Sequence, residues 1–392
     1  MKTDRRGFLA GALAAAPLFV PAKAWGANDR PAYGVIGTGG RGRYVSALFQ
    51  KLGAECVALC DVYQPHLDLA RKDAPQARTL VDSNELLALK GVDCVLIATP
   101  DHQHRPNLLA ALAAGKDVYL EKPMSHSLEE SRLMVEAVRQ TDRIVQIGMQ
   151  RRTAPLISRA KALIDGGALG RISLVSPMWN WNVSKPLNNS PLEGKLDWKR
   201  FLGPAAERNL EPMRFRSWRL FWDYSGGNMT DQGTHLMDVT QWLTNTSHPL
   251  SAVCFGQVQK SAGAEAPDVF SAVFEYPQHM VQWTLDYCSS YQNGWSLTFR
   301  GDEGTLVIDD EGFLLYREPW RETKNREPAQ VVKEGLFVEP HVRNFLDCMK
   351  SRQQPAAPVE VGASAVCGPH LANIAFQKQC QARLGPDGKV SV

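Results

Sequence analysis

The sequence predicts an α/β protein with an N-terminal doubly wound parallel sheet and a second α/β domain built on a mainly antiparallel sheet. Three observations predict this class. Short apolar runs alternate with helical segments between residues 30 and 152, runs with period-two alternation dominate beyond residue 152, and 392 residues suffice for two domains. A hydrophobic content of 44% also allows a large core.

The strands of the first domain are predicted from five apolar runs that helical segments separate. Parallel strands covered on both faces read as continuous apolar runs. The runs are "AYGVIG", "ECVALCD", "DCVLIAT", "DVYLEKP" and "RIVQIGM". The helices between them are one that runs through Phe49, one that starts near Gln64, and the segments "HRPNLLAALAAG" and "SLEESRLMVEAVRQT".

The second domain opens with a helix, "APLISRAKALIDGG", and a strand, "RISLVSPMWNW". After a long interruption, period-two alternation and hairpin breaks such as "YPQH" and "GDEG" indicate an antiparallel or mixed sheet. Its further strands are "AVCFGQVQ", "VFSAVFEYP", "MVQWTLDYC", "WSLTFRG", "GTLVID" and "GFLLYRE". Two helices, "HVRNFLDCMKS" and "SAVCGPHLANIAFQKQC", close the structure. We therefore place the first domain at residues 29–152 and the second at 153–392.

Residues 1–28 are predicted to be an export signal with a short linker. The segment has Arg5 and Arg6, an apolar run over residues 8–20 that is too short to span a bilayer, and a small-x-small cleavage site ending at Ala24. "TDRRGFL" resembles the twin-arginine (Tat) export motif. The resemblance implies passage through the Tat translocase in the folded state, location in the periplasm or outside the cell, and no membrane anchor after cleavage.

Charge and cysteine usage exclude other classes. The chain has 44 basic and 41 acidic residues, and removal of residues 1–24, with four basic and one acidic residue, leaves 40 of each. A near-neutral mature protein does not favour nucleic acid as a partner. The eight cysteines are scattered without metal-ligand spacing, so no metal site is predicted, and buried free thiols are favoured over disulfides.

A dinucleotide site is predicted directly after the first strand. Gly37, Gly39 and Gly42 fill the G-x-G-x-x-G pattern between a strand and a helix, and Asp61 ends the next strand. The glycines allow the turn, the approach of the pyrophosphate and close packing of helix and strand, while Asp61 accepts hydrogen bonds from the ribose. The carboxylate favours NAD over NADP. The turn also contains Thr38, Gly40 and Arg41, of which Arg41 is the residue that would favour NADP.

Further candidates follow the later strands at the same sheet edge, where a doubly wound sheet binds its ligand. Eight residues are assigned here: seven to the cofactor, the first four of them to its nicotinamide half, and Arg151 to the substrate. They are Thr99, Pro100, His102, His104, Glu121, Lys122, Gln150 and Arg151. For the two histidines, a surface or helix-capping role remains the alternative.

The glycine turn, Asp61, "EKP" and the later "GGNMTDQGTHLMD" together resemble the Gfo/Idh/MocA oxidoreductases, the family of glucose-fructose oxidoreductase and inositol dehydrogenase. The resemblance implies a Rossmann domain followed by an α/β domain whose large open sheet carries the substrate pocket and often an oligomer contact. It also implies that Lys122 bridges the substrate hydroxyl and the nicotinamide ribose, and that Asp231 and His235 are the family's catalytic pair.

The residue pattern around this pair agrees with that assignment. Asp231, His235 and Asp238 lie at positions i, i+4 and i+7 of an expected helix and share one stripe. Removing hydride from a carbinol carbon requires loss of the hydroxyl proton, and a histidine oriented by a carboxylate can accept that proton near neutral pH. A surface ion pair is the alternative for an isolated Asp and His on a helix.

The stretch over residues 179–222 holds five of the ten tryptophans. Aromatic faces that stack on sugar rings, together with polar side chains that reach hydroxyls, would suit a carbohydrate pocket. The candidates here are Trp179, Asn180, Arg214, Trp218 and Tyr224. The alternative is an arm that covers the sheet or a neighbouring subunit, and both descriptions can hold at once.

The resulting hypothesis is an exported oxidoreductase that keeps NAD(H) tightly bound and acts on a sugar, polyol or glycoside. Free NAD is scarce outside the cytosol, so the cofactor would be reoxidised in place by a second substrate or by the same substrate later in its reaction. Two alternatives stay open: an NAD-dependent, redox-assisted glycosidase or lyase, with His235 or Tyr224 as the base, and a nonenzymatic sugar- or cofactor-binding protein. A homo-oligomer, dimer or tetramer, is expected.

Overall fold

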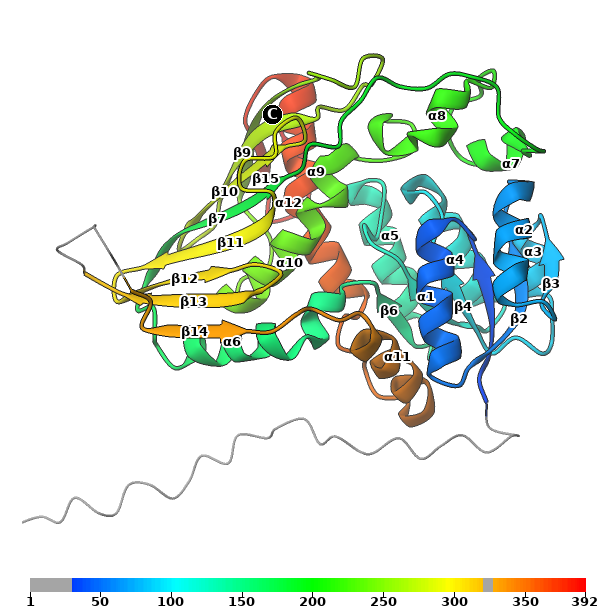
Figure 1. The fold of residues 1–392 in the computed structure, drawn as a ribbon, viewed down its shortest axis with the longest axis horizontal. Helices are drawn as coiled ribbons and strands as arrows, with labels where there is room; N and C mark the ends of the chain where they lie inside the picture. The colour runs from blue at the N-terminus through cyan, green and yellow to red at the C-terminus, as the bar shows by residue number, and fades with distance from the viewer. Residues whose placement is uncertain (1–29, 320–326) are drawn as a thin grey trace, which may run out of the picture. The chain divides into compact units, whose positions relative to one another are not determined.

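The first sheet consists of six parallel strands in the order β3-β2-β1-β4-β5-β6, the strand order of dinucleotide-binding folds (Figure 1). The structure is a computed structural model that describes residues 30–319 and 327–392, so the predicted export segment lies outside the described residues. The strands are β1 Ala32–Ile36, β2 Glu55–Cys60, β3 Arg78–Leu80, β4 Cys94–Ile97, β5 Asp117–Leu120 and β6 Val145–Ile147. The helices are α1 Gly40–Lys51, α2 Gln64–Asp73, α3 Ser83–Leu87, α4 His104–Ala113 and α5 Leu128–Arg139.

Each strand and helix that the sequence predicts in this domain is present. The short strand β3 and the helix α3 were not predicted. Two of the three β3 residues are exposed, so this edge strand lacks the apolar run that marks its neighbours.

The second sheet contains ten strands in the order β14-β13-β12-β11-β7-β10-β9-β8-β15-β16. Among the described residues its neighbouring strands pair antiparallel, except β7 with β10. The strands are β7 Ile172–Asn180, β8 Ser251–Gln257, β9 Val269–Glu275, β10 Met280–Asp286, β11 Gly294–Gly301, β12 Gly304–Ile308, β13 Gly312–Arg317, β14 Gln330–Lys333, β15 Ala382–Leu384 and β16 Val390–Ser391. The prediction of a mainly antiparallel sheet is confirmed.

One face of this sheet is covered by α6 Pro155–Asp165, α10 Gly233–Thr244 and the second half of α12 Val359–Lys378. Side chains alternate in burial along its strands, and the opposite face carries the exposed apolar side chains of Phe255, Met280 and Val331. The strand pairings place all three on that same face. This is the open sheet that the family resemblance implies.

The two C-terminal helices tie the first sheet to the second. Helix α11, Glu339–Ser351, places Phe345 against Phe49 and Tyr119 of the first domain. Helix α12 contributes Ala365 to the core of the first sheet and Leu371 to the core of the second. The boundary at residue 152 therefore separates the two sheets, although helix α12 from the C-terminal part of the chain packs into the cores of both.

Residues 181–226, which join β7 to α9 Gly227–Asp231, are called the arm. The arm contains α7 Trp198–Leu202, α8 Pro212–Arg216 and a short 3-10 turn, Trp218–Leu220. Its own apolar cluster is formed by Phe201, Leu202, Phe221 and Tyr224. In Figure 1 the helices α7 and α8, in green, lie near α2 and α3 of the first domain.

All eight cysteines lie in the described part of the chain and are unpaired, six of them buried, as the sequence predicts. Within residues 30–319 and 327–392 no helix has both the length and the apolar character needed to cross a membrane.

Candidate active site

The glycine turn joins β1 to α1 and has the close contacts that its sequence implies. Gly37 has φ +91°, and a Cβ there would lie 2.7 Å from the Ala98 backbone. A Cβ at Gly42 would lie 2.0 Å from the Gly37 carbonyl oxygen, so helix and strand could not pack as they do. At Gly39 a Cβ would meet only His66, at 3.7 Å. The middle glycine thus leaves open space for a ligand beside the start of α1, where the helix N-terminus favours phosphate.

Asp61, at the end of β2, is buried and organises the turn. One carboxylate oxygen accepts hydrogen bonds from the Thr38 backbone N–H at 2.7 Å and from the Thr38 hydroxyl at 3.2 Å. The other accepts the Tyr63 N–H at 2.9 Å. His66 Nδ1 lies 3.4 Å from the same carboxylate. Asp61 therefore has a structural task in addition to the ribose contact that its position predicts.

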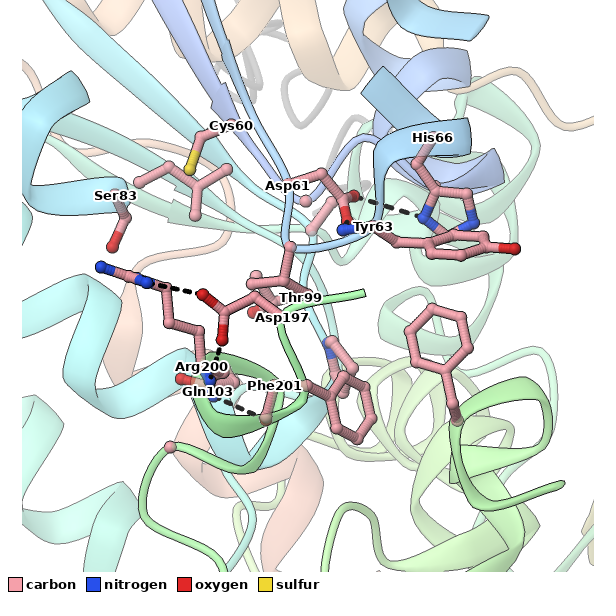
Figure 2. Close-up of a pocket in the computed structure, with 18 of the residues that line it drawn as sticks. Cys60, Asp61, Tyr63, His66, Ser83, Thr99, Gln103, Asp197, Arg200 and Phe201 are labelled. Carbon is pink, nitrogen blue, oxygen red and sulfur yellow. Dashed lines mark hydrogen bonds and ion pairs between the residues drawn. The ribbon is translucent and has the colours of Figure 1, made fainter. Parts of the chain in front are cut away.

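A cleft of about 1000 Å³ opens between the glycine turn and the arm. Figure 2 shows Asp61, Tyr63 and His66 on one wall and residues of the arm on the other. The first domain contributes, among others, Gly37, Gly39, Gly40, Arg41, Asp61, Thr99 and Pro100. The arm contributes Leu192, Asp197, Lys199, Arg200, Phe201, Gly203, Phe215, Arg216, Trp218 and Arg219. The volume, the glycine cradle and the acidic strand end fit a dinucleotide.

The two predicted histidines, His102 and His104, are buried and do not line the cleft; both contact backbone carbonyl oxygens. His102 Nε2 donates to the Phe201 carbonyl oxygen at 2.8 Å, and burial lowers the pKa of His102 to about 4. His104 places its ring nitrogens 2.8 Å from the Pro123 carbonyl oxygen and 2.9 Å from that of Thr99. His104 therefore links the loops after β4 and β5.

Arg41, which is partly exposed, forms an ion pair with buried Glu121, with Arg41 Nε 2.8 Å from Glu121 Oε1. The side chain of Glu121 is nearly inaccessible, and Arg41 also lines the cleft. Because Arg41 already pairs with the Glu121 carboxylate, it is less available to bind the 2′-phosphate of NADP than its place in the glycine turn predicted. Asp61 and this pairing both agree with a preference for NAD.

Lys122 and Asp231 come together across 109 residues of sequence. Lys122 Nζ donates to Asp231 Oδ1 and to the Asp231 backbone oxygen, both at 2.7 Å. Arg219 Nε lies 3.3 Å from the same Oδ1. Burial alone would raise the pKa of Asp231, but the Lys122 and Arg219 cations outweigh it and hold that pKa well below its usual range. The Asp231 carboxylate is thus ionised under all ordinary conditions.

His235 lies one helical turn after Asp231, on α10. The predicted single helix is divided in two, because α9 ends at Asp231 and α10 begins at Gly233. His235 is buried, and its Nδ1 has no partner within the described residues. Burial, with added repulsion from Lys122 and Arg151, lowers the pKa of His235 well below its ordinary value. The imidazole is therefore neutral and free to accept a hydrogen bond.

Asp238, the third member of the predicted stripe, has a separate role. Its Oδ1 accepts a hydrogen bond from Arg152 Nε at 2.7 Å. The pair fastens α10 to the segment that follows β6. Asp238 therefore serves as the partner of Arg152.

A wall of aromatic rings stands close to His235. The Arg151 guanidinium lies 3.8 Å over the Trp295 ring and 5.4 Å from the Trp179 ring centroid. Arg151 is buried, burial lowers its pKa to about 9, and its Nη1 has no hydrogen-bond partner in the described part of the chain. Trp179 Nε1 and Gln150 Oε1 are buried and unpartnered as well. Buried polar groups are normally hydrogen-bonded, so these three atoms are candidates for contacts to a bound molecule.

Three predicted substrate residues lie elsewhere. Asn180 follows Trp179 on β7 and therefore faces the open side of the sheet, where its Nδ2 donates to the Tyr291 carbonyl oxygen. Arg214 is paired with Glu211 and Asp223 of the arm and with Glu265 between β8 and β9. Tyr224 is fully buried in the arm's apolar cluster, and burial raises its pKa to about 12. Trp218, in contrast, lines the cleft.

Two residues that sequence reasoning missed belong to the site. Arg219 contacts Asp231 and lies 4.2 Å over the Trp218 ring. His66 lines the cleft beside Asp61. For His66 a signal existed, since it follows the acidic strand end by five residues. For Arg219 no local pattern separates it from Arg214 and Arg216 of the same segment.

The dinucleotide cleft is connected through its lining residue Arg219 to the Lys122–Asp231 pair, with buried His235 one helical turn further on, and this combination is that of a nicotinamide-dependent oxidoreductase. Residues 32–149 match the NAD-binding Rossmann-fold domain of the Gfo/Idh/MocA oxidoreductase family, and residues 161–365 match its C-terminal α/β domain. The protein belongs to this family. The predicted family, fold and NAD cofactor are therefore confirmed.

Curated relatives include inositol dehydrogenases. The chain is 42% identical over 285 residues to the inositol 2-dehydrogenase/D-chiro-inositol 3-dehydrogenase of Shouchella clausii, covering 71% of each chain. It is 34% identical over 119 residues to the scyllo-inositol 2-dehydrogenase (NAD(+)) of Bacillus subtilis. That match covers 30% of this chain and 35% of the relative.

Solved structures share the fold at low identity. Levoglucosan dehydrogenase in complex with NADH and L-sorbose has a TM-score of 0.73 and 17% identity, covering 91% of this chain and 99% of that one. The WlbA dehydrogenase of Bordetella pertussis, in complex with NADH and UDP-GlcNAcA, has a TM-score of 0.70 and 20% identity with the same coverage. These likenesses confirm the two-domain architecture.

Proposed function

We propose that this protein is an exported oxidoreductase that retains NAD(H) and transfers hydride to and from the hydroxyl-bearing carbon of a sugar, polyol or glycoside. The observation that carries the proposal is the Lys122–Asp231 pair beside neutral His235, at the edge of the sheet where the cofactor cleft lies. The inositol dehydrogenase named above, 42% identical over 71% of the chain, supports a polyol-type substrate.

The three residues divide the proton chemistry. Bound NAD supplies the hydride acceptor. Lys122, fixed by two hydrogen bonds of 2.7 Å to Asp231, presents its charge to the substrate hydroxyl and stabilises the developing alkoxide. His235 accepts the hydroxyl proton through an unpartnered ring nitrogen. Burial and Lys122 disfavour protonated His235, which favours transfer of this proton to the carbonyl compound that takes back the hydride.

Substrate binding is assigned to the wall beside His235. Arg151 Nη1 and Trp179 Nε1 are buried donors without partners, and sugar hydroxyls are suitable acceptors for both.

Export and cofactor retention rest on separate observations. The twin-arginine motif at Arg5 and Arg6 supports export in the folded state, with NAD already bound. The arm forms one wall of the cofactor cleft, which supports retention. A retained NADH is reoxidised in place, when a second carbonyl compound, or a transient ketone of the same substrate, takes back the hydride and a proton.

The two alternative functions receive less support. For a redox-assisted glycosidase or lyase the sequence offers His235 or Tyr224 as the base; Tyr224 is fully buried with a pKa raised to about 12, which leaves His235 alone for that role. A nonenzymatic binding protein would have no need for a buried Lys122–Asp231 pair. The expected homo-oligomer is assigned to the open face with Phe255, Met280 and Val331, and light scattering of the purified protein tests it.

The test uses mature protein purified from the periplasm. Mass spectrometry of the released small molecule should identify NAD or NADH. Inositols, sugars and aryl glycosides are then compared in the presence of an artificial electron acceptor. Reduction of the acceptor with a sugar or polyol supports the proposal, release of the aryl group supports the glycosidase, and neither reaction, with sugar binding intact, supports a binding protein.

A further inference from the structure

We propose that the arm is part of the dinucleotide-binding site and that NAD leaves only when the arm detaches from the end of β2. The inference rests on the retained NAD of the proposed function and identifies the residues that enforce it. The arm supplies cationic and aromatic side chains to the cleft, among them Arg200, Phe215 and Trp218. A ligand in this cleft therefore lies between the arm and the glycine turn.

Backbone hydrogen bonds fasten the arm to the segment after β2. Tyr63 and Leu196 form an isolated antiparallel bridge. The Gln64 N–H donates to the Lys195 carbonyl oxygen at 2.9 Å, and the Asp197 N–H donates to the Val62 carbonyl oxygen at 2.8 Å. This bridge starts immediately after Asp61, where the adenosine ribose of a dinucleotide is bound in this fold. The arm thus closes the ribose side of the cleft.

Side chains hold the arm at two further points. Gln103 Nε2 donates to the carbonyl oxygens of Arg200 and Phe201, both at 2.9 Å. Arg200 Nη2 lies 3.2 Å from Asp82 Oδ2, and its Nη1 pairs with Asp197 (Figure 2). These contacts connect α7 to the loops after β3 and β4. Three loops at the carboxyl edge of the first sheet are therefore bound to one segment.

Aromatic side chains also pack between the arm and the first domain. The Phe215 ring lies 4.9 Å from the Tyr63 ring and 6.1 Å from the His66 ring, and all three side chains line the cleft. Their apolar surface would be exposed to water if the arm lifted. Release of the dinucleotide therefore requires breaking the bridge, the Gln103 bonds and this packing together.

Gly194 offers a way to loosen the arm without changing the cleft. Gly194 has φ +78°, and a Cβ there would lie 2.7 Å from Pro65 Cγ, next to the Tyr63–Leu196 bridge. Gly194 does not line the cleft. Gly167 is the matched control, because it has φ +81° and a Cβ there would meet no atom of residues 30–319 and 327–392 within 4 Å. Gly194→Ala and Gly167→Ala thus carry the same backbone strain, and only the first pushes the arm from α2.

The experiment measures release of NADH from the loaded protein after mixing with excess NAD, followed by nicotinamide fluorescence. Gly194→Ala should release NADH about tenfold faster than wild type, since two or three weak contacts suffice for such a factor. Gly167→Ala should release it at the wild-type rate. NAD content after gel filtration provides a second readout that does not depend on turnover.

A reversible crosslink tests the same step in the other direction. Tyr63 and Leu196 form a non-hydrogen-bonded antiparallel pair, because the two backbone hydrogen bonds lie on either side of it. The Cα atoms of such a pair are about 4.5 Å apart, which is within the reach of a disulfide. In the double variant Tyr63→Cys, Leu196→Cys, oxidation should slow NADH release about tenfold relative to the same protein after reduction. The reduced form controls for the lost Tyr63 side chain.

Equal release rates for Gly194→Ala and Gly167→Ala, together with equal rates for the oxidised and reduced double-cysteine variant, would overturn the inference. That result leaves retention itself intact if the wild type still keeps its NAD through gel filtration. Loss of NAD from the wild type contradicts the retention in the proposed function instead. The two failures are therefore distinguishable.

Discussion

Replacing Lys122 by methionine removes one charge from the candidate site and keeps the length of the side chain. In the native protein Lys122 Nζ makes two hydrogen bonds of 2.7 Å to Asp231, and its side chain is 12% exposed. Its loss leaves Arg219, 3.3 Å from the same carboxylate oxygen, as the neighbouring cation. Asp231 therefore remains compensated, and the variant is expected to fold.

The magnitude follows from both roles of the lysine. Removing one partner of a buried ion pair costs about 3–5 kcal/mol, and the remaining Arg219 contact should keep the loss of unfolding free energy near the lower value. An acid–base group in a transition state contributes about 10²–10⁴-fold. Lys122→Met should therefore slow hydride transfer by about that factor, while NAD binding through Asp61 and the glycine turn persists.

The assay is the single-turnover reduction of bound NAD by a responsive sugar or polyol, followed by the absorbance of the reduced nicotinamide. His235→Ala should show a similar loss. Because residues that act as a unit are not additive, the double variant should be little slower than the poorer single variant. Thermal unfolding of each variant reports the structural contribution separately.

Wild-type rates in Lys122→Met or His235→Ala would refute the assignment of the proton-handling unit. Fully additive losses in the double variant would refute the coupling between the two residues. In the first case Asp223 is the next candidate to test, although its arginine partners Arg208 and Arg214 make it a weaker base than a free carboxylate.

Three further predictions concern other parts of the chain. Asp61→Ala should relax the preference for NAD over NADP. It should also weaken NAD binding about tenfold, because the Asp61 carboxylate accepts hydrogen bonds from the Thr38 and Tyr63 N–H groups that shape the turn. Competition between the two dinucleotides measures both effects, and an unchanged preference contradicts the prediction. Burial lowers the pKa of His341 to about 4, so its contribution to stability is fully present above about pH 6.5 and is lost as the pH falls toward 4. Between about pH 7 and pH 5 the free energy of unfolding of His341→Gln should therefore fall by about 2 kcal/mol less than that of the wild type. Denaturant unfolding measures both pH profiles, and parallel profiles would contradict the prediction. The double variant Arg5→Lys, Arg6→Lys should stay in the cytosol, as fractionation would show, and unchanged export removes the Tat assignment.

The sequence by itself determined the class of fold and the cofactor. Alternation of apolar strands and helices predicted the first sheet, because burial on both faces requires continuous apolar runs. The glycine turn and Asp61 were readable because their geometry is local: Gly37 and Gly42 are limited by backbone atoms only a few residues or one neighbouring strand away. The same holds for the alternation that identified the second sheet.

Only the tertiary structure decided which side chains meet. Lys122 and Asp231 are 109 residues apart, and the choice of Arg219 over Arg214 as their neighbour depends on how the arm folds. Asn180 and Trp179 are adjacent in sequence yet face opposite sides of β7, since strand side chains alternate. The aromatic residues of the arm read alike in the sequence, but Trp218 lines the cleft and Tyr224 fills the arm's core. Local periodicity reports that a surface is buried, whereas the identity of the opposing surface is set by long-range packing.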